Sequence, residues 1–179
     1  MKRKTNIRWV VRITIISMFT SATFTFLSAQ VLTGAGYILA FSVLLLFIAI
    51  GVLFDIIGVA VTSASEVPFH SMASHKERGA AEALALLRSA EKVASICNDV
   101  VGDISGIVSG TTAVIIVTNL SRKTDSHEVL LQLLISGLVA GFTIGGKAVG
   151  KALAINHSTA IVHFVGRLLR VMGLGSGKK

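Results

Sequence analysis

Two uninterrupted apolar stretches near the start of the chain constrain its fold more than any other feature. They cover residues 9–32 and 37–61. Each is long enough to span a membrane, because roughly 20 apolar residues at about 1.5 Å per residue cross a hydrocarbon core of about 30 Å. The chain of 179 residues is 53% hydrophobic and 15% charged, with a mean hydropathy of +0.78, which is too apolar for one soluble core. The sequence therefore predicts an all-α integral membrane protein.

Two further spans are expected at residues 93–120 and 129–150, which gives about four transmembrane helices in all. Both are rich in Gly, Ala, Ser and Thr, the residues that allow membrane helices to approach closely. Several glycines recur at four-residue steps within each of these spans, and we expect them to pack helix against helix: Gly102, Gly106, Gly110, Gly137 and Gly141. The first stretch has an alternative interpretation as a cleaved signal peptide after the basic "MKRK", although it exceeds the usual apolar length of roughly 7 to 15 residues.

The distribution of Lys and Arg predicts the orientation, because short cytoplasmic loops carry an excess of these residues. With four crossings, most of them fall on one side of the membrane: Lys2, Arg3, Lys4, Arg8, Lys76, Arg78, Arg88, Lys92, Lys178 and Lys179. Arg122 and Lys123 are exceptions. We therefore expect a multi-pass protein of the cell (plasma) membrane with both termini in the cytoplasm. The net charge of +8 then indicates attraction to the anionic inner leaflet, and no nucleic-acid-binding motif is present.

Motifs of enzyme chemistry are not found in the sequence. It contains no P-loop, no G-x-S-x-G and no H-E-x-x-H, and the single cysteine, Cys97, excludes an intramolecular disulfide and a cysteine-based metal cage. The sequence therefore predicts a protein that is not an enzyme.

The polar segment "VTSASEVPFHSMASH", residues 61–75, follows the second apolar stretch and carries signals of a helix start. Ser63 and Glu66 have the spacing of a capping box, Ser65 is an alternative N-cap, and Pro68 falls in the first turn. Ser74 and Glu77 repeat the spacing. We expect residues 66–92 to form a cytoplasmic helical hairpin at the membrane surface. One interpretation of the segment is helix capping alone.

A layer of charged residues is predicted inside the membrane near its inner face. Asp55 and Asp103 each lie about 10 Å from the inner end of their spans, and Asp99 shares a helix face with Asp103. Lys147 is a candidate partner in the last span. Because ionisable groups at that depth are costly, they normally face the bundle interior and pair or bind something. Both a structural ion pair and an ion-binding cluster satisfy this condition.

The last helix is predicted to be amphipathic. His163, Arg167 and Arg170 recur on one face from Asn156 onward, while Ile, Val, Leu and Met cover the rest. This pattern is typical of a helix that lies on a membrane surface with a basic stripe. A helix that binds a protein partner has the same pattern. Residues 173–179 are expected to be a flexible basic tail.

Two stretches resemble the membrane domain of cyclin-M (CNNM) and CorC-type magnesium and cobalt transporters. "SASEVPFHSMASHKERGAAEALALLRSAEKV" resembles the turn that ends a span in that family and the helices that follow it. "GGKAVGKALAINHSTAIVHFVGRLLRVM" resembles the family's later G-E-x-x-P-K-x-x-A turn and amphipathic helix. The resemblance implies a transmembrane domain at residues 37–172, preceded by an extra helix and turn at 1–36 and without the family's cytoplasmic CBS domains.

The resemblance also implies a site for Mg²⁺ or another divalent cation, and a homodimer. Its metal ligands would be oxygen atoms of Ser63, Ser65 and Glu66. The family's Gly-Asn-Asn motif is missing at residues 100–102, and Asn98 and Asp99 are the nearby residues that would substitute for it. The chain departs from the family pattern where Gly-Glu becomes Gly146-Lys147 and where Pro becomes Gly150. A magnesium site needs hard oxygen ligands, so the expected function is a minimal or ion-site-degenerate cation transporter. The alternative is a non-transporting membrane scaffold or complex subunit that binds a partner through its cytoplasmic helices.

Overall fold

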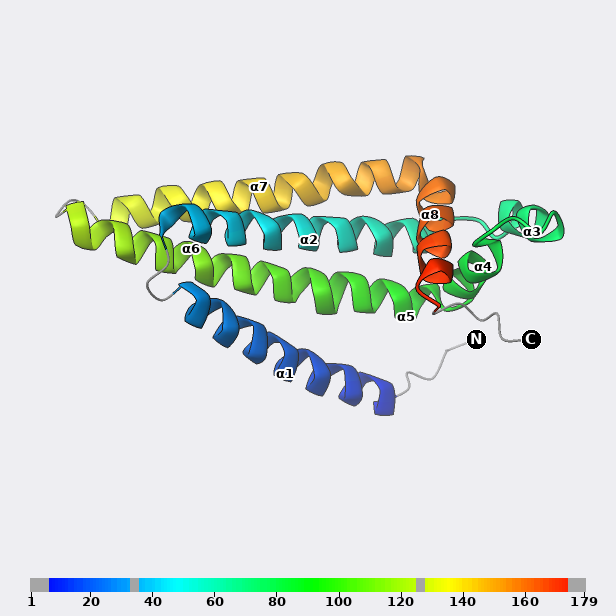
Figure 1. Ribbon diagram of the computed structural model, residues 1–179, viewed down its shortest axis with the longest axis horizontal. Helices are drawn as coiled ribbons and strands as arrows, with labels where there is room; N and C mark the ends of the chain where they lie inside the picture. The colour runs from blue at the N-terminus through cyan, green and yellow to red at the C-terminus, as the bar shows by residue number, and fades with distance from the viewer. Residues whose placement is uncertain (1–6, 33–35, 125–127, 174–179) are drawn as a thin grey trace. The chain divides into compact units, whose positions relative to one another are not determined.

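The computed structural model describes residues 7–32, 36–124 and 128–173, and every element within these ranges is a helix (Figure 1). The elements are α1 (Ile7–Leu32), α2 (Tyr37–Ser63), α3 (Val67–Ser74), α4 (Ala80–Arg88), α5 (Ala90–Ser95), the π-helix η1 (Ile96–Gly102), α6 (Asp103–Thr124), α7 (Glu128–Asn156) and α8 (Ser158–Val171). The predicted all-α architecture is confirmed for the described residues. The predicted tail at 173–179 lies outside them, apart from Gly173.

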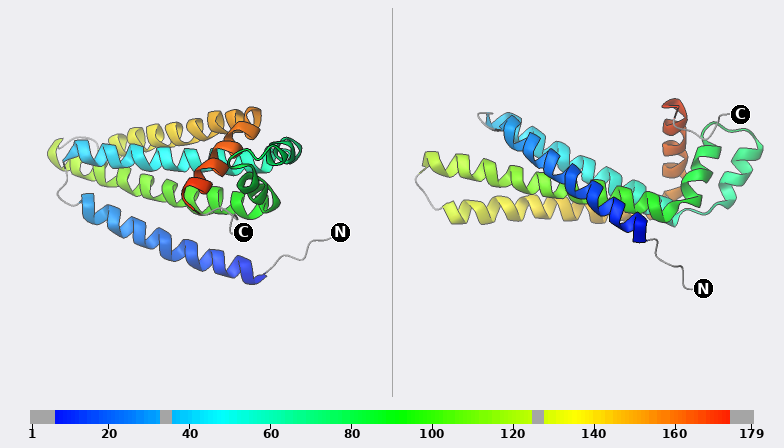
Figure 2. Two further views of the ribbon diagram at one scale, coloured as in Figure 1. Left: turned by 45° about the vertical axis from the view of Figure 1, so that its right-hand side comes forward. Right: turned by 90° about the horizontal axis from the view of Figure 1, so that it is seen from below.

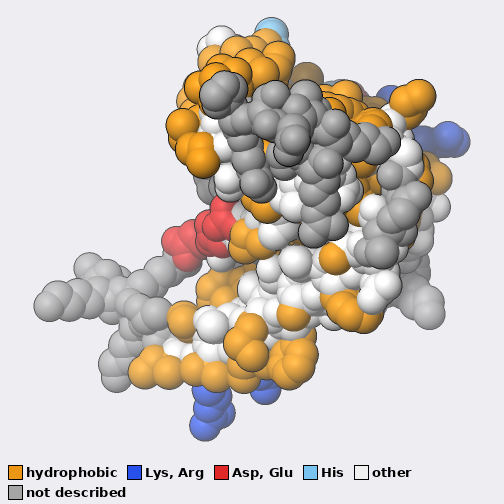
Figure 3. All heavy atoms as spheres, turned by 90° about the vertical axis from the view of Figure 1, so that its left-hand side faces the viewer, with side chains coloured by type: hydrophobic (Ala, Val, Ile, Leu, Met, Phe, Trp, Pro, Cys, Tyr) orange, Lys and Arg blue, Asp and Glu red, His pale blue; other side chains and the backbone are white. Residues whose placement is uncertain are grey.

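Four helical segments are long and apolar enough to cross a membrane, as the sequence predicted. They are Ile7–Leu32, Tyr37–Ser63, Ala90–Leu120 and Gln132–Asn156. Hydrophobic side chains occupy much of the described surface in Figure 3. The last segment ends at Asn156 and not at the predicted residue 150, because α7 continues for six more residues. Glycine does not stop a helix that packs closely against another helix, and no strong helix breaker occurs before Asn156.

The chain forms two compact units, and the first contains Met1–Gly51 and Gly102–Thr143. Its buried core includes Leu32, Leu44 and Ile116 together with the smaller side chains of Ala40 and Ala113. α1 packs on α6, and the hydroxyls of Ser28 and Thr112 form a buried hydrogen bond of 3.2 Å between these helices. This polar pair satisfies two groups that would otherwise be costly to bury.

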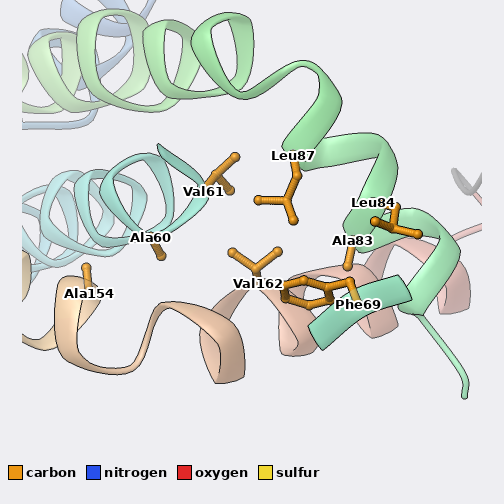
Figure 4. Packing of buried hydrophobic residues seen from close by; sticks show 8 residues of the cluster. All are labelled: Ala60, Val61, Phe69, Ala83, Leu84, Leu87, Ala154 and Val162. Carbon is orange, nitrogen blue, oxygen red and sulfur yellow. The ribbon is translucent and has the colours of Figure 1, made fainter. Parts of the chain in front are cut away.

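The second unit contains Val52–Val101 and Ile144–Lys179. Its core joins the end of α2, the helices α3 and α4, the end of α7, and α8. Figure 4 shows its buried members: Ala60, Val61, Phe69, Ala83, Leu84, Leu87, Ala154 and Val162. The fully buried Phe69 fixes the short helix α3 to this core, because an aromatic side chain removes a large apolar area from water.

Glycines allow α7 to approach α2 within the second unit. A Cβ atom on Gly146 would lie 3.1 Å from Val52 Cγ2, and one on Gly150 would lie 2.7 Å from Ile56 Cγ1. Gly146 and Gly150 are one helical turn apart, as are Val52 and Ile56, so the two pairs form a small-residue contact of the kind found between membrane helices. Gly150 therefore has a packing role that the sequence did not reveal.

The glycines singled out in the sequence behave differently. Gly106, Gly110, Gly137 and Gly141 have open space around the position of a Cβ atom, with no described atom within 4 Å. The carbonyl oxygen of Gly102 lies 3.6 Å from a Cβ atom built on Gly51, at a contact with α2. Packing across a second copy of the chain stays a prediction for the four open glycines.

The predicted hairpin at 66–92 contains α3 and α4, but its helices are not capped as expected. Glu66 occupies the N-cap of α3 without a side-chain cap, and its carboxylate lies 3.5 Å from His70 Nε2. The capping-box prediction is wrong because Ser63 still belongs to α2, and the Ser65 hydroxyl accepts from Val67 N at 3.4 Å. The second predicted capping box, Ser74 and Glu77, is not formed either, because α4 begins after Gly79 without a side-chain cap.

The turn between α3 and α4 is a Schellman motif. The N–H of Lys76 donates to Ala73 O at 3.0 Å, and the N–H of Glu77 donates to Met72 O at 2.9 Å. Lys76 has a φ of 57°, the left-handed conformation that this motif requires after a helix. The turn satisfies the last carbonyl groups of α3 and directs the chain into α4.

α4 and α8 pack backbone against backbone through two glycines. Gly79 has a φ of 92°, and a Cβ atom there would lie 2.5 Å from Arg167 N and 2.8 Å from Arg167 Cα. A Cβ atom on Gly166 would collide with the carbonyl oxygen of Gly79 and would lie 3.0 Å from Ala83 N. Only glycine fits at either position, so we call this contact the glycine clamp (Gly79 and Gly166).

Candidate functional site

Asp55 is the most deeply buried carboxylate in the second unit, and it carries the candidate site. It lies on α2, eight residues before the helix ends at Ser63, which is about 12 Å along the axis. Its side chain is 6% exposed, and its Oδ2 atom has no hydrogen-bond partner among the described residues. A buried carboxylate without a hydrogen bond is expensive unless a positive charge compensates it.

Lys151 supplies that charge. Its Nζ atom lies 3.7 Å from Asp55 Oδ2, which is an ion-pair distance but is too long for a hydrogen bond. The two partners differ in exposure, because the Lys151 side chain is 53% exposed while Asp55 is almost fully buried. The ammonium group can therefore turn away from the pair, whereas the carboxylate stays buried.

The sequence suggested Lys147 as a candidate partner for the charged layer, but the structure pairs Asp55 with Lys151, one turn later on α7. The difference follows from the end of α7, which lies six residues beyond the predicted end of the span. The Gly150 contact with Ile56 brings the following residue, Lys151, beside the turn of α2 that carries Asp55. Lys147 is partly buried, and its role as an intramembrane charge stays a prediction.

Asn98 places a second polar group against α2 in the same unit. Its side-chain amide packs directly on Gly58, where a Cβ atom would collide with Asn98 Oδ1, and that oxygen is buried with no hydrogen-bond partner in the described part of the chain. Gly58 is three residues after Asp55, so the two positions lie on neighbouring turns of one helix face. Asn98 belongs to the π-helix η1, and single π-helical turns inside longer helices occur frequently at functional sites.

The other predicted metal ligands lie at the surface. Ser63, Ser65 and Glu66 are exposed, and the latter two make the local contacts of the α3 start described above. Asp99 is also exposed and accepts a hydrogen bond of 2.7 Å from Ser95 Oγ. Within the described ranges, no group of three or more His, Cys, Asp or Glu side chains is placed to hold a metal ion.

Asp103, the third predicted carboxylate of the charged layer, is exposed and belongs to the first unit. Asp99 and Asp103 were expected to share a helix face with a spacing of four residues. The π-helix ends at Gly102, between the two residues, and its wider turn changes the angular relation between them. Asp55 is therefore the only one of the three that is buried.

The predicted membrane-surface residues separate into two groups. His163 is partly buried, and its Nε2 atom lies 3.2 Å from the carbonyl oxygen of Arg78 and 3.9 Å from Glu77 Oε2. It therefore contacts the turn before α4. Arg167 and Arg170 are exposed on α8.

The fold and the site define the chain as an α-helical protein with four candidate membrane spans and a buried ion pair in its second unit. Comparisons of the chain with protein-family models, with curated proteins and with solved structures give no match.

Sequence reasoning found Asp55 and Asn98 but missed Lys151 and the glycines that position it. One signal was available, because the residues from Lys147 to Asn156 contain no proline and several good helix formers. Extending the last span to Asn156 brings Lys151 inside it, as a second candidate partner beside Lys147.

Proposed function

We propose that the four long helices cross a membrane, with both termini and the 66–92 hairpin in the cytoplasm. The apolar composition of the helices and the Lys and Arg residues of the hairpin support this arrangement. In a Cys97→Ala background, single cysteines at positions 2, 85 and 124 are treated on intact cells with an impermeant maleimide. We expect only the cysteine at position 124 to react. Labelling at position 85 would overturn the orientation.

We further propose that the chain is a membrane domain related to divalent-cation transporters, in which a tethered ammonium group takes the place of the metal ion. The observation that carries this proposal is the loose pair between buried Asp55 and half-exposed Lys151. The packing of Asn98 on the next turn of α2 supports it, because an unpaired buried amide oxygen is a potential cation ligand.

The chemistry of the pair explains why a divalent ion is expected to bind weakly. Asp55 supplies one negative charge, and the Lys151 ammonium compensates it without the near-octahedral oxygen shell that Mg²⁺ requires. An ammonium group binds oxygens through hydrogen bonds, and it does not gather several of them at about 2.0–2.1 Å, the distances typical of bound Mg²⁺. A metal ion would have to displace Lys151 and lose most of its water for a single carboxylate.

Lys151→Glu tests this function. A second carboxylate facing Asp55 is expected to create a divalent-cation site, so millimolar Mg²⁺ or Mn²⁺ should raise the melting temperature of the variant in detergent. The wild type should show little change. Lys147→Glu is the matched control, because it makes the same charge change one turn away and should gain no metal-dependent stabilisation.

Two other outcomes would contradict the proposal. Strong stabilisation of the wild type by Mg²⁺ would indicate a working divalent-cation transporter instead. An absence of metal-dependent stabilisation in all three proteins would favour the alternative function, a membrane scaffold that binds a partner through its cytoplasmic helices. The exposed apolar side chains of α8 are the observation that keeps this alternative open.

A further inference from the structure

The described surface of α8 has three distinct sides. Gly166 is buried against α4, and Val162 is buried in the core of the second unit. Phe164, Leu168 and Val171 are 67%, 50% and 85% exposed, although all three are large and apolar. Arg167 and Arg170 are exposed as well. At 3.6 residues per turn, the two arginines lie between the buried side and the apolar side.

The exposed apolar side is opposite the side that packs on α4. Phe164 follows Val162 by two residues, which is a rotation of roughly 200° around the helix. Within the second unit, α4 lies beyond α8 from the unit's own segments of α2 and α7, as the views in Figures 1 and 2 agree. Because Val162 belongs to the core of the second unit, the side that carries Phe164 faces away from that core.

The short connection between α7 and α8 fixes the position of α8 relative to the end of the candidate span. The candidate span of α7 ends at Asn156 and α8 begins at Ser158, so only His157 separates them. His157 leaves the helical conformation with a φ of −121° and a ψ of 28°. The chain then turns, and α8 runs across the axis of the adjoining part of α7 (Figure 1). A helix that leaves a span in this way starts at the membrane surface and lies along it.

We propose that α8 binds the surface of an anionic lipid bilayer, an inference that rests on the membrane insertion proposed above. Phe164, Leu168 and Val171 enter the boundary between headgroups and acyl chains, and Arg167 and Arg170 contact lipid phosphates beside them. Apolar residues that insert and basic residues at their edge are the features of interfacial helices. Near an anionic surface, each Arg contributes an attraction equivalent to about fivefold in occupancy.

A lipid surface fits this face better than a protein partner does. These apolar side chains lie on a helix that follows a candidate span after a single residue, so a bilayer that holds the span is adjacent to them. The positive charge of Arg167 and Arg170 complements anionic headgroups. His163 does not belong to the lipid contact, because its ring faces the carbonyl oxygen of Arg78 on the turn before α4.

The test uses the full-length protein in nanodiscs and an environment-sensitive fluorophore on single cysteines in a Cys97→Ala background. Labels replace Phe164 or Leu168 on α8, Ala85 on the exposed side of α4, and Leu45 in the second span. Nanodiscs contain either phosphatidylcholine alone or phosphatidylcholine with 30% phosphatidylglycerol, a proportion of about one-third chosen to model an anionic leaflet. Quenching is compared between doxyl-labelled lipid and aqueous iodide.

We expect lipid quenching at positions 45, 164 and 168, and iodide quenching at position 85. Arg167→Gln with Arg170→Gln should reduce the lipid-quenched population at 164 severalfold in the anionic nanodiscs and have much less effect in the neutral ones. If position 45 is quenched by lipid while 164 and 168 are quenched by iodide, α8 does not bind lipid although the chain is inserted. Protection of 164 and 168 from both quenchers identifies a protein partner or a second copy and also overturns the inference. If the label at position 45 is not quenched by lipid, the proposal that the chain is inserted in a membrane is itself overturned.

Discussion

Gly79→Ala should destabilise the protein by about 2–5 kcal/mol. The new methyl group would meet the backbone of Arg167 at 2.5–2.8 Å, and neither backbone can move without separating α4 from α8. Overpacking of this kind costs about 1–3 kcal/mol, and a left-handed conformation adds about 1–2 kcal/mol for a residue with a Cβ atom. Thermal melts in detergent measure the loss, and hydrogen exchange of the α8 amides reports whether α8 has left α4.

Gly166→Ala acts on the same contact and provides an internal check. Its methyl group would collide with the Gly79 carbonyl oxygen and would crowd Ala83. Because either substitution separates the helices, the double variant should be little worse than the more damaging single variant. Gly145→Ala is the matched control, since no described atom lies within 4 Å of its Cβ position and alanine favours the helix by up to about 1 kcal/mol. Additive losses, or unchanged melting of Gly79→Ala, would contradict the glycine clamp.

Lys151→Met should destabilise the protein by about 1–3 kcal/mol, because it leaves the buried Asp55 carboxylate without a counter-charge. The reverse substitution is not equivalent. Asp55→Asn leaves Lys151 half exposed, and its ammonium can turn to water at little cost. Thermal melts of the two single variants should therefore show a clear asymmetry, with the larger loss for Lys151→Met.

The double variant with Asp55→Asn and Lys151→Met separates charge from packing. Removing both charges should recover most of the stability lost in Lys151→Met, since a buried ion pair can be replaced by neutral groups at little cost. Lys147→Met is the control for loss of a lysine from α7, and we expect it to have the smaller effect. If Lys147→Met is the more damaging of the two, Lys147 and not Lys151 is the functional partner of Asp55.

The sequence was sufficient to predict the helical class, the approximate bounds of the four long apolar helices and the burial of Asp55. Long apolar runs have few alternatives to helices, because backbone groups must be satisfied internally wherever water is excluded. A single aspartate within such a run is conspicuous for the same reason. The helices of the 66–92 segment were also predictable from their helix-forming residues, although the proposed capping box was not formed.

The choice of partners depended on the tertiary structure. Lys147 and Lys151 differ by one turn of α7, and the pair that forms is decided by where α7 ends and by the contacts of Gly146 and Gly150 with α2. The three residues of the predicted basic stripe on α8 also have different surroundings in the folded chain. The glycine clamp places His163 beside the turn before α4, whereas Arg167 and Arg170 stay exposed. Local sequence patterns specify which residues share a helix face, whereas the backbone distance between helices selects which of those faces meet.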